Sequence, residues 1–148
     1  MRASLSSGRA RRAAILFARI ALASAFLSGI ADRFALWPAR WEGYGSYAGF
    51  VRYTAKVNAF MPSWTIPYLA GAATVGELTL GVGLLVGWQL RWVSVASAAL
   101  LFLFGTAMAL SFGPKIPLDY SVFSAAAAAI LIAVFDEGVP DKTSSANT

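Results

Sequence analysis

Long apolar runs separated by short polar segments form the main pattern of the chain. The runs cover residues 13–31, 66–88, 92–112 and 118–135. About 20 apolar residues are enough for a helix to cross a bilayer, and runs of this length predict membrane spans. The pattern therefore predicts an all-α integral membrane four-helix bundle over residues 13–135. A basic segment, residues 1–12, precedes it, and a polar tail that we expect to be disordered, residues 136–148, follows it.

The first run contains one charge, Arg19, and follows a segment rich in arginine. The tripeptide Ala21-Leu22-Ala23 resembles a signal-peptide cleavage site. However, Arg19 interrupts the apolar stretch after six residues, and the stretch continues well past the tripeptide. The pattern favours a first helix that is retained over one that is cleaved.

The longest connection, residues 32–65, is rich in aromatic residues and predicts more than a linker. Tyr47, Phe50, Thr54, Val57 and Met61 recur at helical spacing on one side. This predicts a short amphipathic helix that lies in the membrane interface and covers the outer mouth of the bundle. The alternative is an aromatic belt that only anchors the chain among the headgroups. Only the first interpretation creates a pocket.

Composition supports a membrane protein and excludes several kinds of chemistry. Of the 148 residues, 58% are hydrophobic and 13% are charged, whereas about 25% are charged in ordinary soluble domains. Cysteine and histidine are absent, which excludes disulfides, iron–sulfur clusters and thiolate or imidazole metal sites. We expect no metal centre.

The chain has a net charge of +5. Its basic residues flank the apolar runs, which predicts contact with anionic lipid rather than with nucleic acid. Arg2, Arg9, Arg11 and Arg12 precede the first run. The positive-inside rule then predicts a multi-pass protein of the cell (inner) membrane with both termini in the cytoplasm. The oligomeric state cannot be inferred from the sequence.

Glu77 is the most informative single residue. It lies near the middle of residues 66–88, which contain no other charge, so it would sit near the bilayer midplane. Ionisable groups at that depth usually face a bundle interior or a polar cavity and mark functional sites. The residues that share its helix face, which we therefore expect to point inward, are Ala70, Ala73, Thr74, Gly81 and Leu84. Glu77 is the candidate proton-handling residue.

The sequence leaves alternative contacts open for Glu77. Arg19 is the natural candidate, because it is the only other charge well inside a run. The alternative is that Arg19 extends along its helix to the cytoplasmic surface. Glu77 could also be a protonated structural contact, hydrogen-bonded to Thr74 or Thr79.

A second polar group gathers at the predicted outer ends of the runs, where Asp32, Arg33, Lys115, Asp119 and Tyr120 lie. These residues could bind a polar or anionic head, or they could be interfacial charges and helix caps. Taken together, the sequence predicts a set of ligand-binding candidates: Arg19, Asp32, Tyr53, Lys56, Thr74, Glu77, Lys115, Asp119 and Tyr120.

Several stretches resemble the DoxX family of small four-helix membrane proteins. They are ARIALASAFLSGIADRF in the first run, ATVGELTLGVGLLVGW around Glu77, and GPKIPLDYSVFSAAAAAIL at the fourth. The resemblance covers about residues 18–135. Some family members belong to membrane oxidoreductase systems, including the DoxD-type subunit of a thiosulfate:quinone oxidoreductase, and others are associated with thiol-stress complexes.

The resemblance implies an accessory subunit of a membrane redox system that binds a quinone or another small ligand. Without cysteine or histidine, such a subunit would bind quinone or dock a redox protein partner that carries the redox group. The alternative is a non-catalytic membrane scaffold or a carrier of a small solute. Whether the chain is an enzyme is not decided by its sequence.

Overall fold

The computed structural model describes residues 2–41 and 43–136, with side chains from residue 8 onward. The predicted tail, residues 137–148, lies outside the described residues. The elements in chain order are α1 (Arg2–Arg33), η1 (Ala39–Trp41), α2 (Tyr47–Val57), η2 (Ser63–Thr65), α3 (Ile66–Val86), α4 (Leu90–Phe112), α5 (Lys115–Asp119) and α6 (Val122–Phe135).

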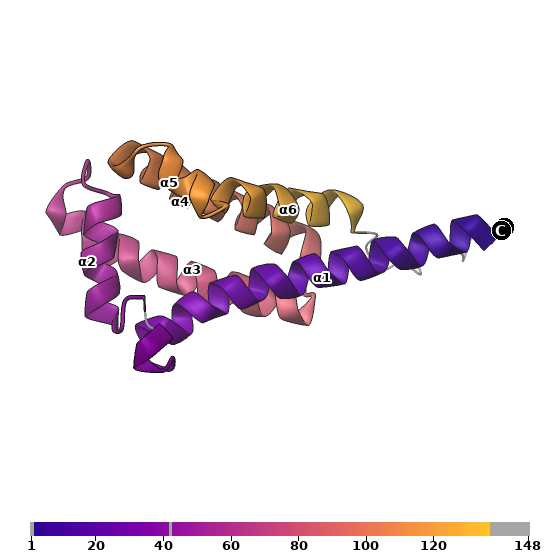
Figure 1. Ribbon diagram of the computed structural model, residues 1–148, viewed down its shortest axis with the longest axis horizontal. Helices are drawn as coiled ribbons and strands as arrows, with labels where there is room; N and C mark the ends of the chain where they lie inside the picture. The colour runs from indigo at the N-terminus through magenta and orange to yellow at the C-terminus, as the bar shows by residue number, and fades with distance from the viewer. Residues whose placement is uncertain (1, 42, 137–148) are drawn as a thin grey trace, which may run out of the picture.

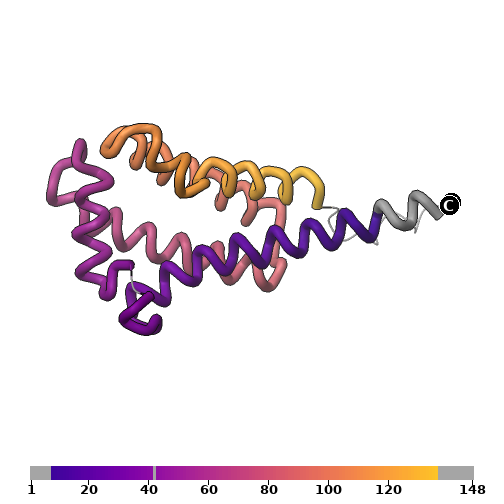
Figure 2. Tube along the Cα trace, viewed as in Figure 1, coloured from indigo at the N-terminus to yellow at the C-terminus, as the bar shows by residue number. Residues whose placement is uncertain are grey.

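The long helices form two closely packed pairs, α1 with α3 and α4 with α6 (Figure 1). Helices that pack against each other run antiparallel, and α2 lies across one end of the bundle. We call that end, with α2 and residues 34–46, the cap end. The opposite end, where residues 87–89 join α3 to α4, is the turn end. At the turn end α1 extends past the other helices (Figure 2).

Local backbone chemistry sets the ends of α3 and α4. Pro67 lies in the first turn of α3, where its missing N–H removes no helical hydrogen bond. Gly87 ends α3 in the left-handed conformation, with φ of 76°, so the helix is two residues shorter than the predicted run. Gly113 ends α4 with φ of 88°, and Pro114 follows it.

Three of the helices are long and apolar enough to cross a membrane: Gly8–Arg33 of α1, Ser63–Val86 and Leu90–Phe112. These helices confirm the prediction of an all-α membrane helical bundle. The predicted fourth run is shorter than expected, because Ser121 adopts a left-handed conformation and separates α5 from α6. α6 has 14 residues and a length of about 21 Å, less than the roughly 30 Å of a hydrocarbon core.

The core lies where the two helix pairs meet. Its buried side chains come from α1, α3, α4 and α6: Leu22, Ala23, Phe26, Leu84, Leu90, Val93, Ala98, Ala129 and Ile132. The inward face predicted for α3 is confirmed by the burial of Ala70, Glu77, Gly81 and Leu84. A Cβ at Gly81 would lie 3.0 Å from the side chain of Leu27, so α1 and α3 can approach this closely only because the residue is glycine.

The amphipathic helix predicted between the first two runs is present as α2. Ser46 caps its first turn by accepting a hydrogen bond from the backbone N–H of Gly49 at 3.1 Å. Phe50, Thr54 and Val57 are buried against the bundle, as their spacing predicts. The other two residues of the predicted face, Tyr47 and Met61, are exposed, and Met61 lies beyond the end of α2. The helix packs on α1, α3 and α4 and therefore covers the cap end.

Candidate functional site

Glu77 pairs with Arg33, the last residue of α1. Nη2 of Arg33 donates to both carboxylate oxygens of Glu77 at 2.8 Å. The exposed fractions are 3% for Arg33 and 5% for Glu77, so the pair is enclosed by protein. The antiparallel register of α1 and α3 explains the match, because it places the end of α1 beside the middle of α3.

The Arg33 guanidinium is held on several sides. Nη1 donates to the hydroxyl of Thr74 at 3.1 Å, and Thr74 donates in turn to the carbonyl of Ala70 at 2.8 Å. The guanidinium carbon lies 3.5 Å from the centre of the Phe50 ring, a cation–π contact that fastens α2 to the pair. Nε of Arg33 is buried without a hydrogen-bond partner among the described residues.

Arg19 does not pair with Glu77, so the first of the two interpretations of Arg19 is wrong. Arg19 Nε and Nη2 donate to the carbonyls of Leu84 and Leu85, at 3.0 and 3.2 Å. Both carbonyls belong to the last turn of α3, where a cation interacts favourably with the helix dipole. The structural alternative for Glu77, a contact with Thr74 or Thr79, is also wrong: Thr74 bonds Arg33, and Thr79 is exposed.

Asp32 fixes the segment that leads from α1 to α2. Its two carboxylate oxygens accept hydrogen bonds from the backbone N–H groups of Gly43 and Tyr44, at 2.9 and 2.6 Å. The neighbouring residues Asp32 and Arg33 thus contact different parts of the molecule. Asp32 binds the segment that connects α1 to α2, and Arg33 binds Glu77 of α3 and Phe50 of α2.

Aromatic side chains cover the pair at the cap end. The ring of Tyr44 lies 5.2 Å from that of Phe50 and 5.1 Å from that of Tyr53, and Tyr53 continues to Phe112 of α4 at 6.4 Å. Burial, with a smaller contribution from the nearby Tyr53, raises the pKa of Tyr44 from 10.0 to about 12. Burial also raises the pKa of Tyr53, with a smaller contribution from Tyr120.

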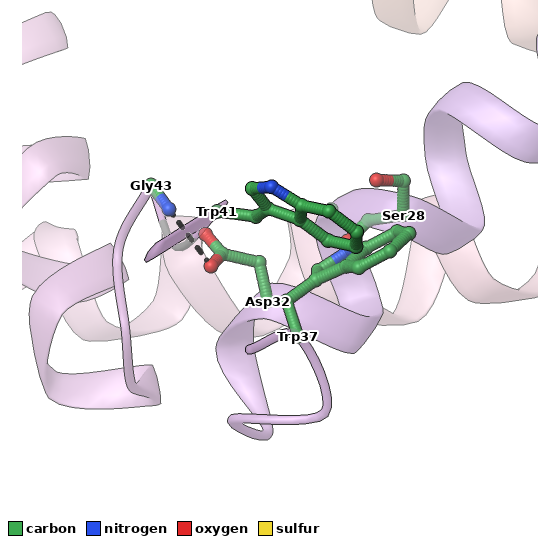
Figure 3. Close-up of a pocket in the computed structure, with 6 residues that line it drawn as sticks. Ser28, Asp32, Trp37, Trp41 and Gly43 are labelled. Atoms are coloured by element: carbon green, nitrogen blue, oxygen red, sulfur yellow. Dashed lines mark hydrogen bonds between the residues drawn. The ribbon is translucent and has the colours of Figure 1, made fainter. Parts of the chain in front are cut away.

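A pocket of about 510 Å³ opens beside this cluster (Figure 3). Its lining comes from the end of α1 and from the segment that follows: Ser28, Gly29, Asp32, Trp37, Trp41 and Gly43. The indoles of Trp37 and Trp41 meet edge to face with centres 6.0 Å apart. Trp37 is held there because its Nε1 donates to the carbonyl of Ser28 at 3.2 Å.

Gly29 separates the pocket from the buried pair. A Cβ at Gly29 would lie 3.2 Å from Oε2 of Glu77 and 3.9 Å from Nη2 of Arg33. Gly29 therefore lines the pocket and also lies against the carboxylate. The pair and the pocket form one site at the cap end.

The remaining predicted candidates do not join this site. Lys115 and Asp119 form an exposed ion pair with each other, one turn apart on α5. Tyr120 is exposed beside them, and Lys56 is on the outer side of α2. Of the nine candidates, the structure brings together Asp32, Thr74, Glu77 and Tyr53.

The sequence reasoning missed the role of Arg33 and the pocket residues Trp37, Trp41 and Gly29. One signal could have identified Arg33. It follows Gly29 by four residues, and Gly29 lies on the face of α1 that packs against α3. For Trp37 and Trp41 the sequence carries no comparable signal, because their positions depend on the irregular segment held by Asp32.

Comparison with known proteins gives one match. No curated protein and no solved structure matches the chain. The family model described as DoxX matches residues 14–112, a range that includes α1 from residue 14 onward, the cap, α3, α4 and both residues of the buried pair. The chain belongs to the DoxX family.

Proposed function

We propose that the protein is an accessory subunit of a membrane redox system and that it binds a quinone-like ligand in the Trp37–Trp41 pocket. The proposal places the bundle in the cell (inner) membrane with both termini in the cytoplasm, so that the cap end faces outward. The observation that carries it is the aromatic pocket, whose lining residue Gly29 lies against a buried arginine–glutamate pair.

The pocket residues suit a planar, weakly polar ring. The indoles of Trp37 and Trp41 supply flat apolar surfaces, and the pocket volume of about 510 Å³ is in the range of small-molecule sites. The hydroxyl of Ser28 lines the pocket and can donate to a quinone carbonyl. A bound quinone would supply the electron-accepting chemistry that a chain without cysteine or histidine lacks.

The protein's own residues would bind and orient this ligand. Asp32 lines the pocket directly and is the carboxylate placed to exchange a proton with a bound ring. Glu77 lies behind Gly29 with both oxygens bonded to Arg33, which favours a positioning role over direct contact. A redox protein partner would dock at the cap end and exchange electrons with the ligand.

Thermal unfolding of the purified protein with decylubiquinone tests the proposal. We expect the quinone to raise the melting temperature of the wild type, because a ligand that binds only the folded state stabilises it. Trp41→Leu should abolish the shift. Trp64→Leu is the matched control, since Trp64 is also an exposed tryptophan in a short helix at the cap end but does not line the pocket.

An equal shift in wild type, Trp41→Leu and Trp64→Leu would show that quinone only partitions into the detergent or the helix surface, and would contradict the proposal. No shift in any of them would favour the second candidate, a non-catalytic scaffold. The ion pair between Arg33 and Glu77 supports that candidate. A purely structural role, in which the pair holds α1 to α3, is enough to explain why the carboxylate is buried.

A further inference from the structure

A second cavity lies on the opposite part of the molecule, along the seam between α4 and α6. Its volume is about 640 Å³. Most of its lining is apolar, with four alanines among the larger side chains: Val95, Ala98, Ala99, Phe102, Ala126, Ile130, Ala133 and Val134. Two charged residues, Arg91 and Asp136, complete it. We call this cavity the seam groove.

Both charges lie at the turn end of the groove, because Arg91 is in the first turn of α4 and Asp136 is the C-cap of α6. Within the part of the chain that the structure describes, neither side chain makes an ion pair or a hydrogen bond. Trp88 and Trp92 are exposed beside Arg91, with exposed fractions of 65% and 68%. Exposed tryptophans mark the headgroup level of a bilayer, so this end of the groove is at that level.

The length of the groove matches one leaflet. From Arg91 to Phe102 the lining advances 11 residues along α4, or about 16 Å at 1.5 Å per residue. Half of a hydrocarbon core is about 15 Å. The groove therefore begins at the headgroups and ends near the midplane, which suits one acyl chain of one leaflet.

The charges select the headgroup. Arg91 can bond a phosphate, and Asp136 can accept a hydrogen bond from an ammonium group. An anionic glycerol headgroup would bring its phosphate to Arg91 but would offer no cation to Asp136. A trimethylammonium headgroup has no N–H to donate. A headgroup with a phosphate and a primary ammonium satisfies both residues.

We infer that the seam groove is a binding site for a phospholipid with a primary amine headgroup, such as phosphatidylethanolamine. Its acyl chain lies against the alanines of α4 and α6, its phosphate bonds Arg91, and its ammonium bonds Asp136. The lipid fills the cavity between α4 and the short α6, and so completes the packing of the helix pair on the side away from the cap.

Native mass spectrometry with synthetic phospholipids tests this site. We expect one equivalent of phosphatidylethanolamine to bind about tenfold more tightly than phosphatidylglycerol or phosphatidylcholine with the same acyl chains, the size expected for one hydrogen bond to a charged group. Asp136→Asn should remove the preference, and Arg91→Gln should weaken binding of all three lipids. Arg52→Gln, at an exposed arginine of the cap end, should change nothing.

A substitution that fills the groove distinguishes lipid binding at this site from nonspecific lipid binding around the helices. Ala99→Leu should reduce phosphatidylethanolamine binding at least about tenfold, because the larger side chain occupies the space of the acyl chain. Ala96→Leu is the matched control, since Ala96 is exposed on the same helix but does not line the groove. Equal binding of the three lipids, or equal binding by the two leucine variants, would overturn the inference.

Discussion

Two arginines of α1 bind α3, and the difference between them shows what fixes this bundle. Arg33 bonds a side-chain carboxylate in the middle of α3, where protein encloses both groups. Arg19 bonds backbone carbonyls in the last turn of α3 and is only half-buried. If Arg19 is lost, water can hydrate the carbonyls at the turn end. If Arg33 is lost, a charge is left buried without a partner. Water can therefore replace the contact made by Arg19, but it cannot replace the contact made by Arg33.

The largest effect is expected from Arg33→Met. The substitution keeps much of the apolar length but leaves Glu77 buried without its partner, which should lower the free energy of unfolding by about 3–5 kcal/mol. Denaturant unfolding in detergent micelles measures the change. Arg52→Met, at an exposed arginine on α2, is the control and should leave stability nearly unchanged. Equal stability of both variants would show that the Arg33–Glu77 ion pair does not stabilise the fold.

A smaller effect is expected from Asp32→Asn. The amide keeps one acceptor but turns an N–H donor toward a backbone N–H group of Gly43 or Tyr44. Loss of one hydrogen bond to a charged group should cost about 1.5–3 kcal/mol. Because the loss falls on the connecting segment, limited proteolysis should cut within residues 34–46 sooner than in the wild type. Unchanged proteolysis would contradict the role of Asp32.

Arg19→Gln should have the weakest effect on stability. The favourable interaction of a cation with a helix C-terminus is about 0.3–1 kcal/mol, and water can replace the lost hydrogen bonds at this half-exposed position. The same unfolding assay should resolve the ranking Arg33→Met, Asp32→Asn, Arg19→Gln. If Arg19→Gln is as destabilising as Arg33→Met, the contrast between the two arginines fails.

High pH should loosen the cap without a mutation. The pKa of Tyr44 is raised in the folded state to about 12, so its neutral form favours folding. This contribution is complete below about pH 10, the ordinary pKa of tyrosine, and is lost as the pH rises toward 12. Absorbance of tyrosinate should show a late-titrating component from Tyr44 and Tyr53, whose pKa values are both raised, and Tyr44→Phe should reduce its amplitude. An unchanged amplitude in Tyr44→Phe would contradict the assignment.

The sequence was sufficient for the regular parts of this molecule and insufficient for the contacts between them. Periodicity predicted the helices, the inward face of α3 and the buried side of α2, because each depends on residues near one another in the chain. The partner of Glu77 depends on how far α1 extends beside α3. Arg33 follows the last predicted residues of the first run, and it was therefore assigned to the membrane surface rather than to the interior.

The pocket was beyond sequence reasoning for a related physical reason. Trp37 and Trp41 are positioned by a segment that contains one short 3-10 helix, η1, and is held by hydrogen bonds to Asp32 and to the carbonyl of Ser28. Such bonds have no repeating pattern along the chain. The fourth run is also predicted to begin at Leu118, whereas α6 begins at Val122, because Ser121 adopts a left-handed conformation that separates α5 from α6.

A double-mutant cycle on Arg33 and Glu77 tests the central claim, that a buried ion pair fastens α1 to α3 beneath the cap. Unfolding free energies are measured for the wild type, Arg33→Met, Glu77→Leu and the double variant. Each single variant leaves one buried charge unpaired, whereas the double variant leaves none. We predict that the double variant is more stable than the sum of the single losses by at least about 2 kcal/mol. Additive losses would contradict the claim.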